Sequence, residues 1–324
     1  MNANFKTWTI RNGTPALCIL LIAGAGVGTL TTLAAPRAAS ARMSPAIPTS
    51  IQLTATIRDF KARELSGGHT DFEWQPTDGF GHYIGEVADT LDARGLPVFN
   101  SSGYKVDREW KNSSGRNIMN PHGHITGKPG DAAGAAQSSP GGAIHTSASF
   151  AQWYRDVSGV NQSIDIPITM KYDAATSSYV FDDRTDPDYA MLGGFFPIDD
   201  KLMGNYGATG HNYGFTAMIE TQFVYEKNAG YMFTFRGDDD VWVFVDGKLS
   251  IDLGGVHGGT DQSIELDRLN WLIDGKTYSL RFFFAERHTS QSNFRIESNF
   301  VLQDVNSHHR PAIKGWEEVE PRNE

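Results

Sequence analysis

The sequence has a single cysteine, Cys18, which lies in an apolar segment near the N-terminus. If that segment is removed, no cysteine remains, and this excludes both disulfide bonds and thiolate metal sites in the mature chain. Basic residues are also scarce, because 28 Lys and Arg stand against 38 Asp and Glu, for a formal net charge of −10 at pH 7. Nucleic acids and anionic membrane surfaces are negatively charged themselves, so this charge disfavours both as partners.

Motifs typical of enzymes are missing as well. The sequence has no nucleophile-elbow motif, no zinc-ligand spacing and no phosphate-binding loop. We therefore do not expect an enzyme. Glycine and aromatic residues are abundant, with 34 glycines and 11% aromatic residues. This composition favours a β-rich fold with many tight turns.

The first 41 residues have the features of a secretory signal peptide. Lys6 and Arg11 form a basic region, residues 16–35 carry no charged side chain, and residues 39–41 (ASA) match a small-x-small cleavage site. Cleavage there would place the mature start near Arg42, and the loss of three basic residues would change the net charge from −10 to −13. We expect an exported protein, outside the cell or on its surface, with the periplasm as an alternative location. The competing interpretation is an uncleaved anchor, since an apolar segment of this length can span a bilayer.

The composition divides the rest of the chain into a linker, one domain and a tail. Residues 42–50 are rich in Pro, Ser and Ala and are interpreted as a linker. One domain is predicted over residues 51–304, and we do not expect it to insert into a membrane. The polar residues 305–324 are expected to be a disordered tail. Residues 111–144 are rich in Gly, Asn, Ser and Pro and predict a long surface loop.

One short amphipathic helix is predicted over residues 149–157, where Phe150, Trp153 and Tyr154 share the apolar side. Elsewhere the pattern predicts closely spaced strands without intervening helices. Such an arrangement indicates an all-β fold, an antiparallel sandwich or barrel with long loops. The predicted strands cover residues 52–58, 164–172, 178–182, 216–225, 231–236, 241–245, 249–252, 278–286 and 294–303.

The most informative segment is residues 235–252, FRGDDDVWVFVDGKLSID. Its three adjacent aspartates repel one another, so an ordered site there needs a cation or several hydrogen-bond donors. Ca²⁺ suits such ligands because it accepts about six to eight oxygens in flexible geometry. The alternative is a solvated acidic turn. The apolar strand that follows confines the loop, and its Asp246-Gly247 end is a strong signal for a two-residue hairpin.

The chain resembles the fibro-slime domain, a module of bacterial surface proteins and slime-mould secreted proteins that is similar to the PA14 domain of toxins, glycosidases and yeast flocculins. The resemblance implies a PA14-like β-sandwich over nearly the whole mature chain. It is carried by the stretches IRDF (57–60), DFE (71–73), GLPVF (95–99), FAQWYRDVSGVN (150–161), GGFFPIDD (193–200), HNYGFTAMIETQFVY (211–225), FTFRGDDDVWVFVDGKLSIDLGGVH (233–257) and FFFAERHTSQSNFRIES (282–298).

The similarity to Ca²⁺-dependent PA14 lectins implies a role for the aspartates. In those lectins two adjacent aspartates, joined by a cis peptide bond, hold a Ca²⁺ that also binds sugar hydroxyls. Asp238 and Asp239 occupy these positions. Asp240 stands where PA14 domains usually have glycine, and it is interpreted either as a third Ca²⁺ ligand or as a turn cap. An asparagine or backbone carbonyls from a neighbouring loop complete the shell, with Asn293 and residues 254–259 as the candidates here.

Four further polar residues are candidates to contact the ligand or to support the calcium loop. His257 lies in the GGVHGG segment, and Glu286, Arg287 and His288 follow an apolar run at a predicted strand end. The alternative for Glu286 and Arg287 is a structural ion pair with the acidic triplet.

Several aromatic residues of the strands raise a similar choice. Trp242, Phe244 and residues 282–284 could stack on a sugar, but aromatic residues in such strands are more often core. We expect most of them to be core.

Three functions remain open at this point. The first is a non-catalytic, Ca²⁺-dependent carbohydrate-binding or adhesion module whose partner is an extracellular glycan or polysaccharide. The second is a structural matrix or coat component in which Ca²⁺ serves only for stability. The third is a glycosidase, which the adjacent aspartates fit poorly because its two carboxyl groups must flank the bond from about 5–10 Å apart.

Overall fold

The computed structural model describes residues 47–206 and 209–305. The expected signal peptide, the first part of the linker and the tail from residue 306 lie outside these ranges. The described part is built mainly of strands, with one short α-helix. In chain order the elements are β1 (Ser50–Phe60), β2 (Tyr83–Ile84), β3 (Tyr104–Arg108), β4 (Ala135–Ala136), α1 (Ser147–Phe150), β5 (Asn161–Asp173), β6 (Ser178–Asp182), β7 (Phe215–Val224), β8 (Met232–Gly237), β9 (Asp240–Val245), β10 (Lys248–Leu253), β11 (Thr260–Glu265), the 3-10 helix η2 (Leu266–Arg268), β12 (Thr277–Glu286), β13 (Phe294–Ser298) and β14 (Gln303–Asp304).

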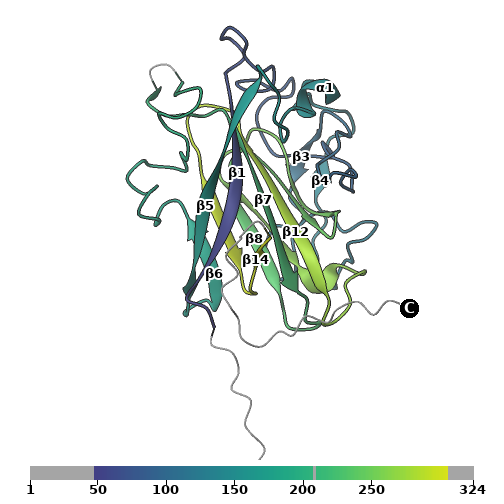
Figure 1. Cartoon of the computed structure of the whole chain (residues 1–324). Coiled ribbons are helices and arrows are strands. Elements are labelled where there is room, and N and C mark those ends of the chain that lie inside the picture. Colours follow the sequence, from purple (N-terminus) through teal and green to yellow (C-terminus); the bar gives the residue numbers. More distant parts are fainter. Residues whose placement is uncertain (1–46, 207–208, 306–324) are drawn as a thin grey trace, which may run out of the picture. The chain divides into compact units, whose positions relative to one another are not determined.

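The main strands form one antiparallel sheet in the order β10-β9-β12-β7-β1-β5-β6-β13-β8-β11, with β14 paired to β7. Figure 1 shows β5, β1, β7 and β12 side by side, as this order requires. The two ends of the order are joined by side-chain hydrogen bonds. Gln262 of β11 accepts from the backbone N–H of Asp252 in β10 at 2.9 Å, and its amide donates to the Asp252 carbonyl. The sheet is therefore a nearly closed barrel or sandwich, which confirms the predicted all-β fold.

The predicted Asp246-Gly247 hairpin joins β9 to β10. Both residues have positive φ, 52° at Asp246 and 75° at Gly247, as a two-residue type I′ turn requires. Val245 and Lys248 pair directly across the turn. The turn fixes the register of β9, and with it the position of Asp240 at the other end of the strand.

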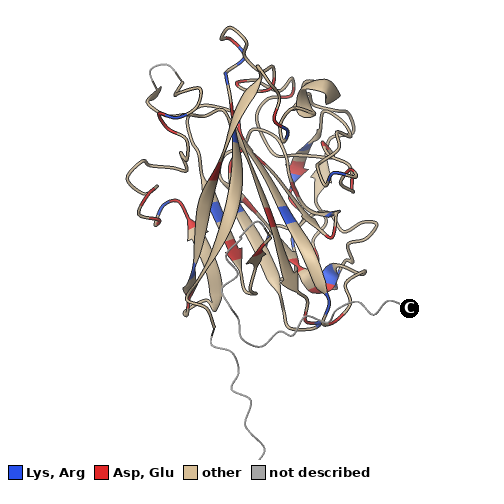
Figure 2. Ribbon diagram, viewed as in Figure 1, with Lys and Arg blue, Asp and Glu red and all other residues tan. Residues whose placement is uncertain are grey.

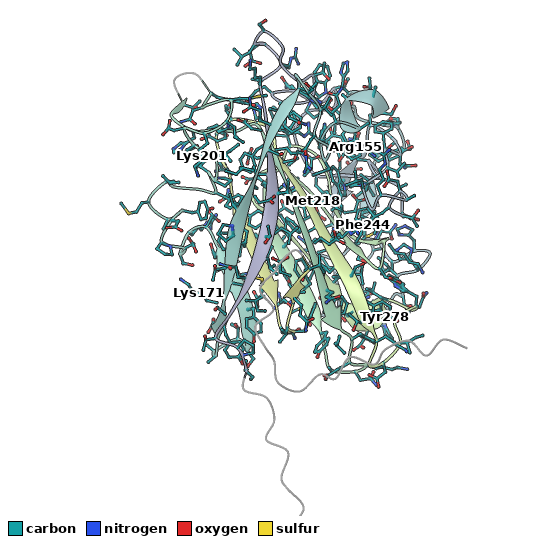
Figure 3. All side chains as sticks on the ribbon, viewed as in Figure 1. Arg155, Lys171, Lys201, Met218, Phe244 and Tyr278 are labelled. Atoms are coloured by element: carbon teal, nitrogen blue, oxygen red, sulfur yellow. The ribbon has the colours of Figure 1, made fainter. Side chains whose placement is uncertain are left out.

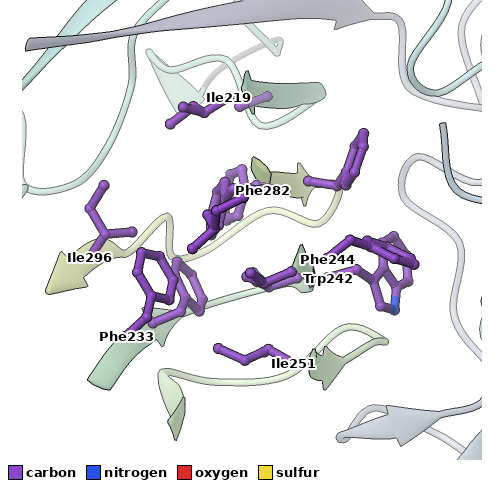
Figure 4. Close-up of a cluster of buried hydrophobic side chains, with 14 of the residues drawn as sticks. Ile219, Phe233, Trp242, Phe244, Ile251, Phe282 and Ile296 are labelled. Carbon is purple, nitrogen blue, oxygen red and sulfur yellow. The ribbon is translucent and has the colours of Figure 1, made fainter. Parts of the chain in front are cut away.

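The interior of the sheet is filled with aromatic and branched aliphatic side chains. Figure 4 shows part of this cluster, including Ile219 of β7 and Ile251 of β10. Trp242, Phe244 and Phe282–Phe284 are each at most 2% exposed. The expectation that most of these aromatic residues are core is confirmed, and burial excludes all of them as a surface for sugar stacking.

The helix predicted over residues 149–157 is wrong in its extent, because α1 ends at Phe150 and turns follow. Asn161 explains the early end. Its side-chain amide donates to the carbonyls of Gln152 and Arg155, and a helix that continued to residue 157 would use the Gln152 carbonyl for its own hydrogen bond to the N–H of residue 156. The three aromatic residues expected on the apolar side are buried: Phe150, Trp153 and Tyr154.

The segment 111–144, predicted as a surface loop, has little regular structure but is not confined to the surface. Four apolar residues spaced along it are at most 5% exposed: Ile118, Met119, Ile125 and Ile144. The segment joins β2, β3 and the region around α1 in a layer with densely placed side chains (Figure 3). The glycine and serine content correctly predicted an irregular backbone. It did not indicate that apolar residues of this segment would be buried.

Other strands also differ from the prediction, among them the short β2, β3 and β4, which were not predicted. β11 was not predicted, because its sequence TDQSIE contains a single apolar residue. The strand expected over residues 294–303 ends at Ser298. The Ser298 hydroxyl donates to the Phe300 carbonyl and accepts from the Phe300 N–H, which turns the chain away from the sheet.

Acidic and basic residues are interspersed along the ribbon (Figure 2). Across the described ranges, 47–206 and 209–305, no helix is both long enough and apolar enough to span a bilayer.

Phe294, the first residue of β13, is central to the aromatic core next to the acidic loop. It is 0% exposed and stacks on Phe195 with ring centroids 4.5 Å apart. We expect Phe294→Ala to reduce the free energy of unfolding by about 3–5 kcal/mol, because the cavity left behind cannot collapse fully. Chemical denaturation measures this change. Val301→Ala is the control, since Val301 is 38% exposed and should cost under about 1 kcal/mol. Equal losses for the two variants would contradict this description of the core.

Candidate metal centre

The acidic loop is the connection between β8 and β9. Across the nearly closed edge these strands are separated only by β11 and β10, and the chain passes from β8 to β9 through Asp238 and Asp239. The peptide bond between these two residues is cis, as the similarity to PA14 lectins implied. Gly237, just before them, passes close to a neighbouring loop, because an added Cβ there would lie 2.2 Å from the Asn293 carbonyl oxygen.

Asp238 is held by Asn293. Its Oδ1 accepts from the Asn293 backbone N–H and its Oδ2 from the Asn293 side-chain amide at 2.8 Å. The Asn293 Oδ1 in turn accepts from the Arg184 guanidinium at 2.8 Å. The structure therefore brings Asn293, a residue predicted to complete the site, into contact with Asp238.

Asp239 is held by two backbone groups from two other loops. Its Oδ1 accepts from the N–H of His257 and its Oδ2 from the N–H of Arg287, both at 3.2 Å. The predicted 254–259 segment is thus adjacent to the acidic loop. It approaches Asp239 through the backbone amide of His257. The centroid of the His257 ring lies 6.1 Å from that of the His82 ring.

Asp240 forms a buried ion pair with Arg287. The guanidinium donates through Nε to Oδ2 at 2.5 Å and through Nη2 to Oδ1 at 3.1 Å, and both side chains are 0% exposed. The Gly255 N–H donates to the same Oδ1 at 2.6 Å. Trp153 covers the guanidinium, whose Cζ lies 5.3 Å from the ring centroid. The alternative expectation of an ion pair between Arg287 and the acidic triplet is thus present in the structure, through Asp240.

Glu286 and His288 flank Arg287 but have different environments. Glu286 is 0% exposed, and its Oε2 has no hydrogen-bond partner within the described residues. Burial and the negative charges of Asp239 and Asp238 raise the pKa of Glu286 well above its ordinary value. His288 points to the other side, with its Nδ1 2.8 Å from a carboxylate oxygen of Glu73.

The charges of the acidic loop are unevenly compensated. Asp238 and Asp239 are only 2% and 4% exposed, and burial raises the pKa of both carboxyl groups, most strongly that of Asp239, where the Asp240 charge adds to it. The hydrogen bonds to these two carboxylates come from neutral N–H groups. The full charge of Arg287 is directed at Asp240. Among the described residues, no cationic side chain therefore contacts Asp238 or Asp239 directly.

One buried acid near this loop was not foreseen from the sequence. Glu86 is 0% exposed, and burial together with the charge of Asp240 raises its pKa well above the usual value. Two glycines leave room for it, since an added Cβ at Gly254 would lie 1.9 Å from its Oε2 and one at Gly103 would lie 2.8 Å from its Cγ. Glu86 stands in no motif, and only its place in the fold brings it to Arg287.

A metal ion at this loop would need oxygens other than acidic side chains. The residues that the structure describes contain no group of three or more His, Cys, Asp and Glu side chains arranged to hold one. Asp238 and Asp239 could supply two carboxylates, with the remaining ligands from amide or carbonyl oxygens and water. Such oxygen-only, partly hydrated shells are typical of Ca²⁺.

Comparison with known proteins identifies the region around this loop. Residues 177–312 match the PA14 domain family, and this range contains the acidic loop and all the candidate ligands. The resemblance to the PA14 family is confirmed. The matching region begins after β5, so the covering layer, formed by residues 61–153, lies outside it.

Relatives from Dictyostelium discoideum extend the similarity further along the chain. Protein psiQ is 39% identical over 171 residues, covering 49% of this chain and 16% of psiQ. Protein psiD is 34% identical over 259 residues, covering 78% of this chain and 42% of psiD. The chain thus spans less than half the length of each of these relatives. They are slime-mould proteins, as the fibro-slime resemblance implied.

Among solved structures, the PA14 domain of the MpAFP antifreeze protein is similar at 12% identity, with 34% of this chain and 52% of that chain covered. The TM-score is 0.20, too low to bear on the fold or the site.

The buried pair of Arg287 and Asp240 can be tested by a double-mutant cycle. Removing one partner of a buried ion pair leaves an uncompensated charge and costs about 3–5 kcal/mol. We expect Arg287→Met and Asp240→Asn each to lower the unfolding free energy by about this amount. The double variant should lose less than the sum of the two. Chemical denaturation provides all the values.

Arg281→Gln is the control for that cycle. Its ion pair with Glu220 is partly exposed, at 24% and 31%, and should contribute under about 1 kcal/mol. Strictly additive losses in the double variant would contradict a direct interaction between Arg287 and Asp240.

Proposed function

We propose that this protein is a non-catalytic, Ca²⁺-dependent carbohydrate-binding or adhesion module that is exported and acts outside the cell or on its surface. Its partner would be an extracellular glycan or polysaccharide. The observation that carries the proposal is the pair of buried, adjacent carboxylates of Asp238 and Asp239, which no cationic side chain in the described part of the chain contacts directly.

The charge balance supports a bound divalent cation. Burying an ionised carboxylate is costly unless a charge or several hydrogen bonds compensate it. Arg287 is fully engaged with Asp240, so it offers Asp239 only its backbone N–H. Arg184 reaches Asp238 through the side chain of Asn293. A cation held by Asp238 and Asp239 would relieve the repulsion that raises their pKa values.

The roles of the remaining residues follow from their contacts. Asn293 orients Asp238, while the backbone of residues 254–259 and of Arg287 orients Asp239. Asp240 is assigned a structural role, because its carboxylate already accepts three hydrogen bonds from Arg287 and Gly255. When bound, Ca²⁺ would supply electrostatic attraction for vicinal hydroxyl groups of a sugar. Glu286 lies buried beside the pair, and the charges of Asp239 and Asp238 contribute to its raised pKa.

The glycan partner and the extracellular location rest on other observations. The PA14 match covers the site, and Ca²⁺-dependent lectins of that type place the metal on the corresponding aspartates. The N-terminal sequence has the pattern of a signal peptide. A purely structural Ca²⁺ is the second candidate, and it differs from the first only in the absence of a sugar.

Calcium dependence is tested with an isosteric variant. At a free Ca²⁺ concentration about 100 times its dissociation constant, binding should stabilise the protein by about 2.7 kcal/mol. This corresponds to a rise in Tm of several degrees, about 2–4 °C per kcal/mol for a domain of this size. We expect Asp239→Asn to lose the difference in Tm between CaCl₂ and EDTA. Calorimetry should show no heat of Ca²⁺ binding for this variant.

The control is Asp246→Asn, the same change in the exposed hairpin turn, where asparagine also tolerates positive φ. It should keep the full Ca²⁺ effect. A wild-type Tm unaffected by chelator would contradict the metal site. If Ca²⁺ binds but a glycan array stays blank, the structural role is favoured, and release of sugar from a labelled polysaccharide would contradict the non-catalytic assignment.

A further inference from the structure

A cavity of about 360 Å³ lies beside β10 and β11, and its lining does not include Asp238, Asp239 or Asp240. One wall comes from β10 and β11, including Asp252 and Gln262, and the opposite wall from residues 82–122 of the covering layer. Its volume is in the range of small-molecule sites, about 300–1,000 Å³. The cavity is therefore large enough for a small ligand.

Two aromatic rings in the cavity wall are held in place by glycines. An added Cβ at Gly134 would lie 2.4 Å from the Trp110 indole, and one at Gly85 would lie 3.3 Å from the Tyr104 ring. Both aromatic side chains are only half-buried although both line the cavity. Because the backbone packs against them, the rings present fixed apolar surfaces to a ligand.

The polar groups at the base of the cavity are also fixed. His82 contacts Glu109 through Nδ1 at 2.8 Å and the Asp252 carbonyl through Nε2 at 2.9 Å. The Asp252 carboxylate accepts from the Gly85 N–H and from the Trp242 indole N–H. These hydrogen bonds make a rigid floor on which a ligand can rest.

Other polar groups of the lining are available for a ligand. Asn120, Trp110 and Tyr104 line the cavity, and their side chains make no hydrogen bond to any residue in the described ranges. Asn100 uses its amide N–H to bind the Gly85 carbonyl, which leaves its side-chain oxygen. Amide, indole and hydroxyl groups beside flat rings suit a molecule with apolar faces and hydroxyl edges.

The charge of the lining narrows the ligand class. The lining includes Asp89 and Asp252 but no Lys or Arg. Phosphate, sulfate and uronate groups are normally recognised by such cations, so an anionic ligand is disfavoured. Asp89 is already near His122, with Oδ1 3.5 Å from Nε2. The complementary ligand is polar and neutral.

We propose that this cavity binds a neutral pyranose sugar, and that it does so without calcium. The ring faces of the sugar would stack on Trp110 and Tyr104, and its hydroxyl groups would reach Asn100 and Asn120. The site goes beyond the calcium-dependent function, because no candidate metal ligand lines the cavity and the wall of residues 82–122 lies outside the PA14 match.

The test is sugar binding by the purified protein in EDTA, measured by ligand-observed NMR and calorimetry. The probes are methyl glucoside, methyl galactoside, methyl mannoside and cellobiose, with glucose 6-phosphate and glucosamine as charged counterparts. We expect at least one neutral probe to bind in preference to both charged ones. Trp110→Ala should weaken its binding about tenfold.

Matched variants separate this cavity from the metal centre. Trp74→Ala removes a half-buried tryptophan that does not line the cavity, and it should leave sugar affinity unchanged. Asp239→Asn should also retain EDTA-resistant binding, whereas Trp110→Ala should keep the Ca²⁺-dependent change in Tm. If Trp110→Ala does not fold, Asn120→Ala replaces it and should likewise weaken binding.

Three results would overturn the proposal. These are no neutral sugar bound in EDTA, a preference for glucosamine or glucose 6-phosphate, and unchanged affinity in Asn120→Ala and, if it folds, in Trp110→Ala. Loss of the calcium effect on wild-type protein would leave this site standing, and failure of sugar binding in EDTA would leave the metal centre standing. The two proposals therefore fail independently.

Discussion

The buried ion pair between Arg287 and Asp240 is the constraint on which the acidic loop depends. Both side chains are 0% exposed, and two of the three guanidinium nitrogens are directed at one carboxylate. The pair ties the start of β9 to the end of β12, and the backbone N–H of Arg287 then holds Asp239. Because this cation is committed to Asp240, the negative charges of Asp238 and Asp239 are left for a different partner. Stability and the proposed binding of Ca²⁺ at this loop therefore involve the same few charges.

Much of the fold was predictable, because short-range patterns in the sequence determine its strands and its hairpin. The Asp-Gly hairpin and the alternating strands identified the sheet. The resemblance made Asn293 and residues 254–259 candidates to complete the site, and a predicted strand end made Glu286 and Arg287 candidates beside it. What the sequence could not supply were contacts made across long separations. Glu86 reaches the ion pair from a segment without any motif, since its position depends on the close approach of Gly254 and Gly103.

The errors in secondary structure have the same origin. The helix was predicted too long because its apolar periodicity continues past Phe150, but Asn161 binds the Gln152 carbonyl that would have extended it. β11 was missed because it contains only one apolar residue and so shows no alternating pattern. It is a strand because it pairs with β8. The sequence predicted that His257 lies near the acidic loop, but not which of its groups makes the contact. Its backbone N–H supports Asp239, whereas its ring belongs to a different contact, with His82.

The covering layer explains why an aspartate can stand at position 240, where PA14 domains usually have glycine. A glycine there carries no charge, so it needs no cation behind the loop. Asp240 does need one, and the Arg287 that pairs with it is itself buried, under Trp153. Asp71 completes the enclosure, because it accepts from the Trp153 indole N–H through its carboxylate and lies with its carbonyl near the guanidinium. Asp71 and Trp153 both precede residue 177, where the PA14 match begins. The covering layer therefore encloses the Arg287–Asp240 pair and also supplies the second wall of the cavity.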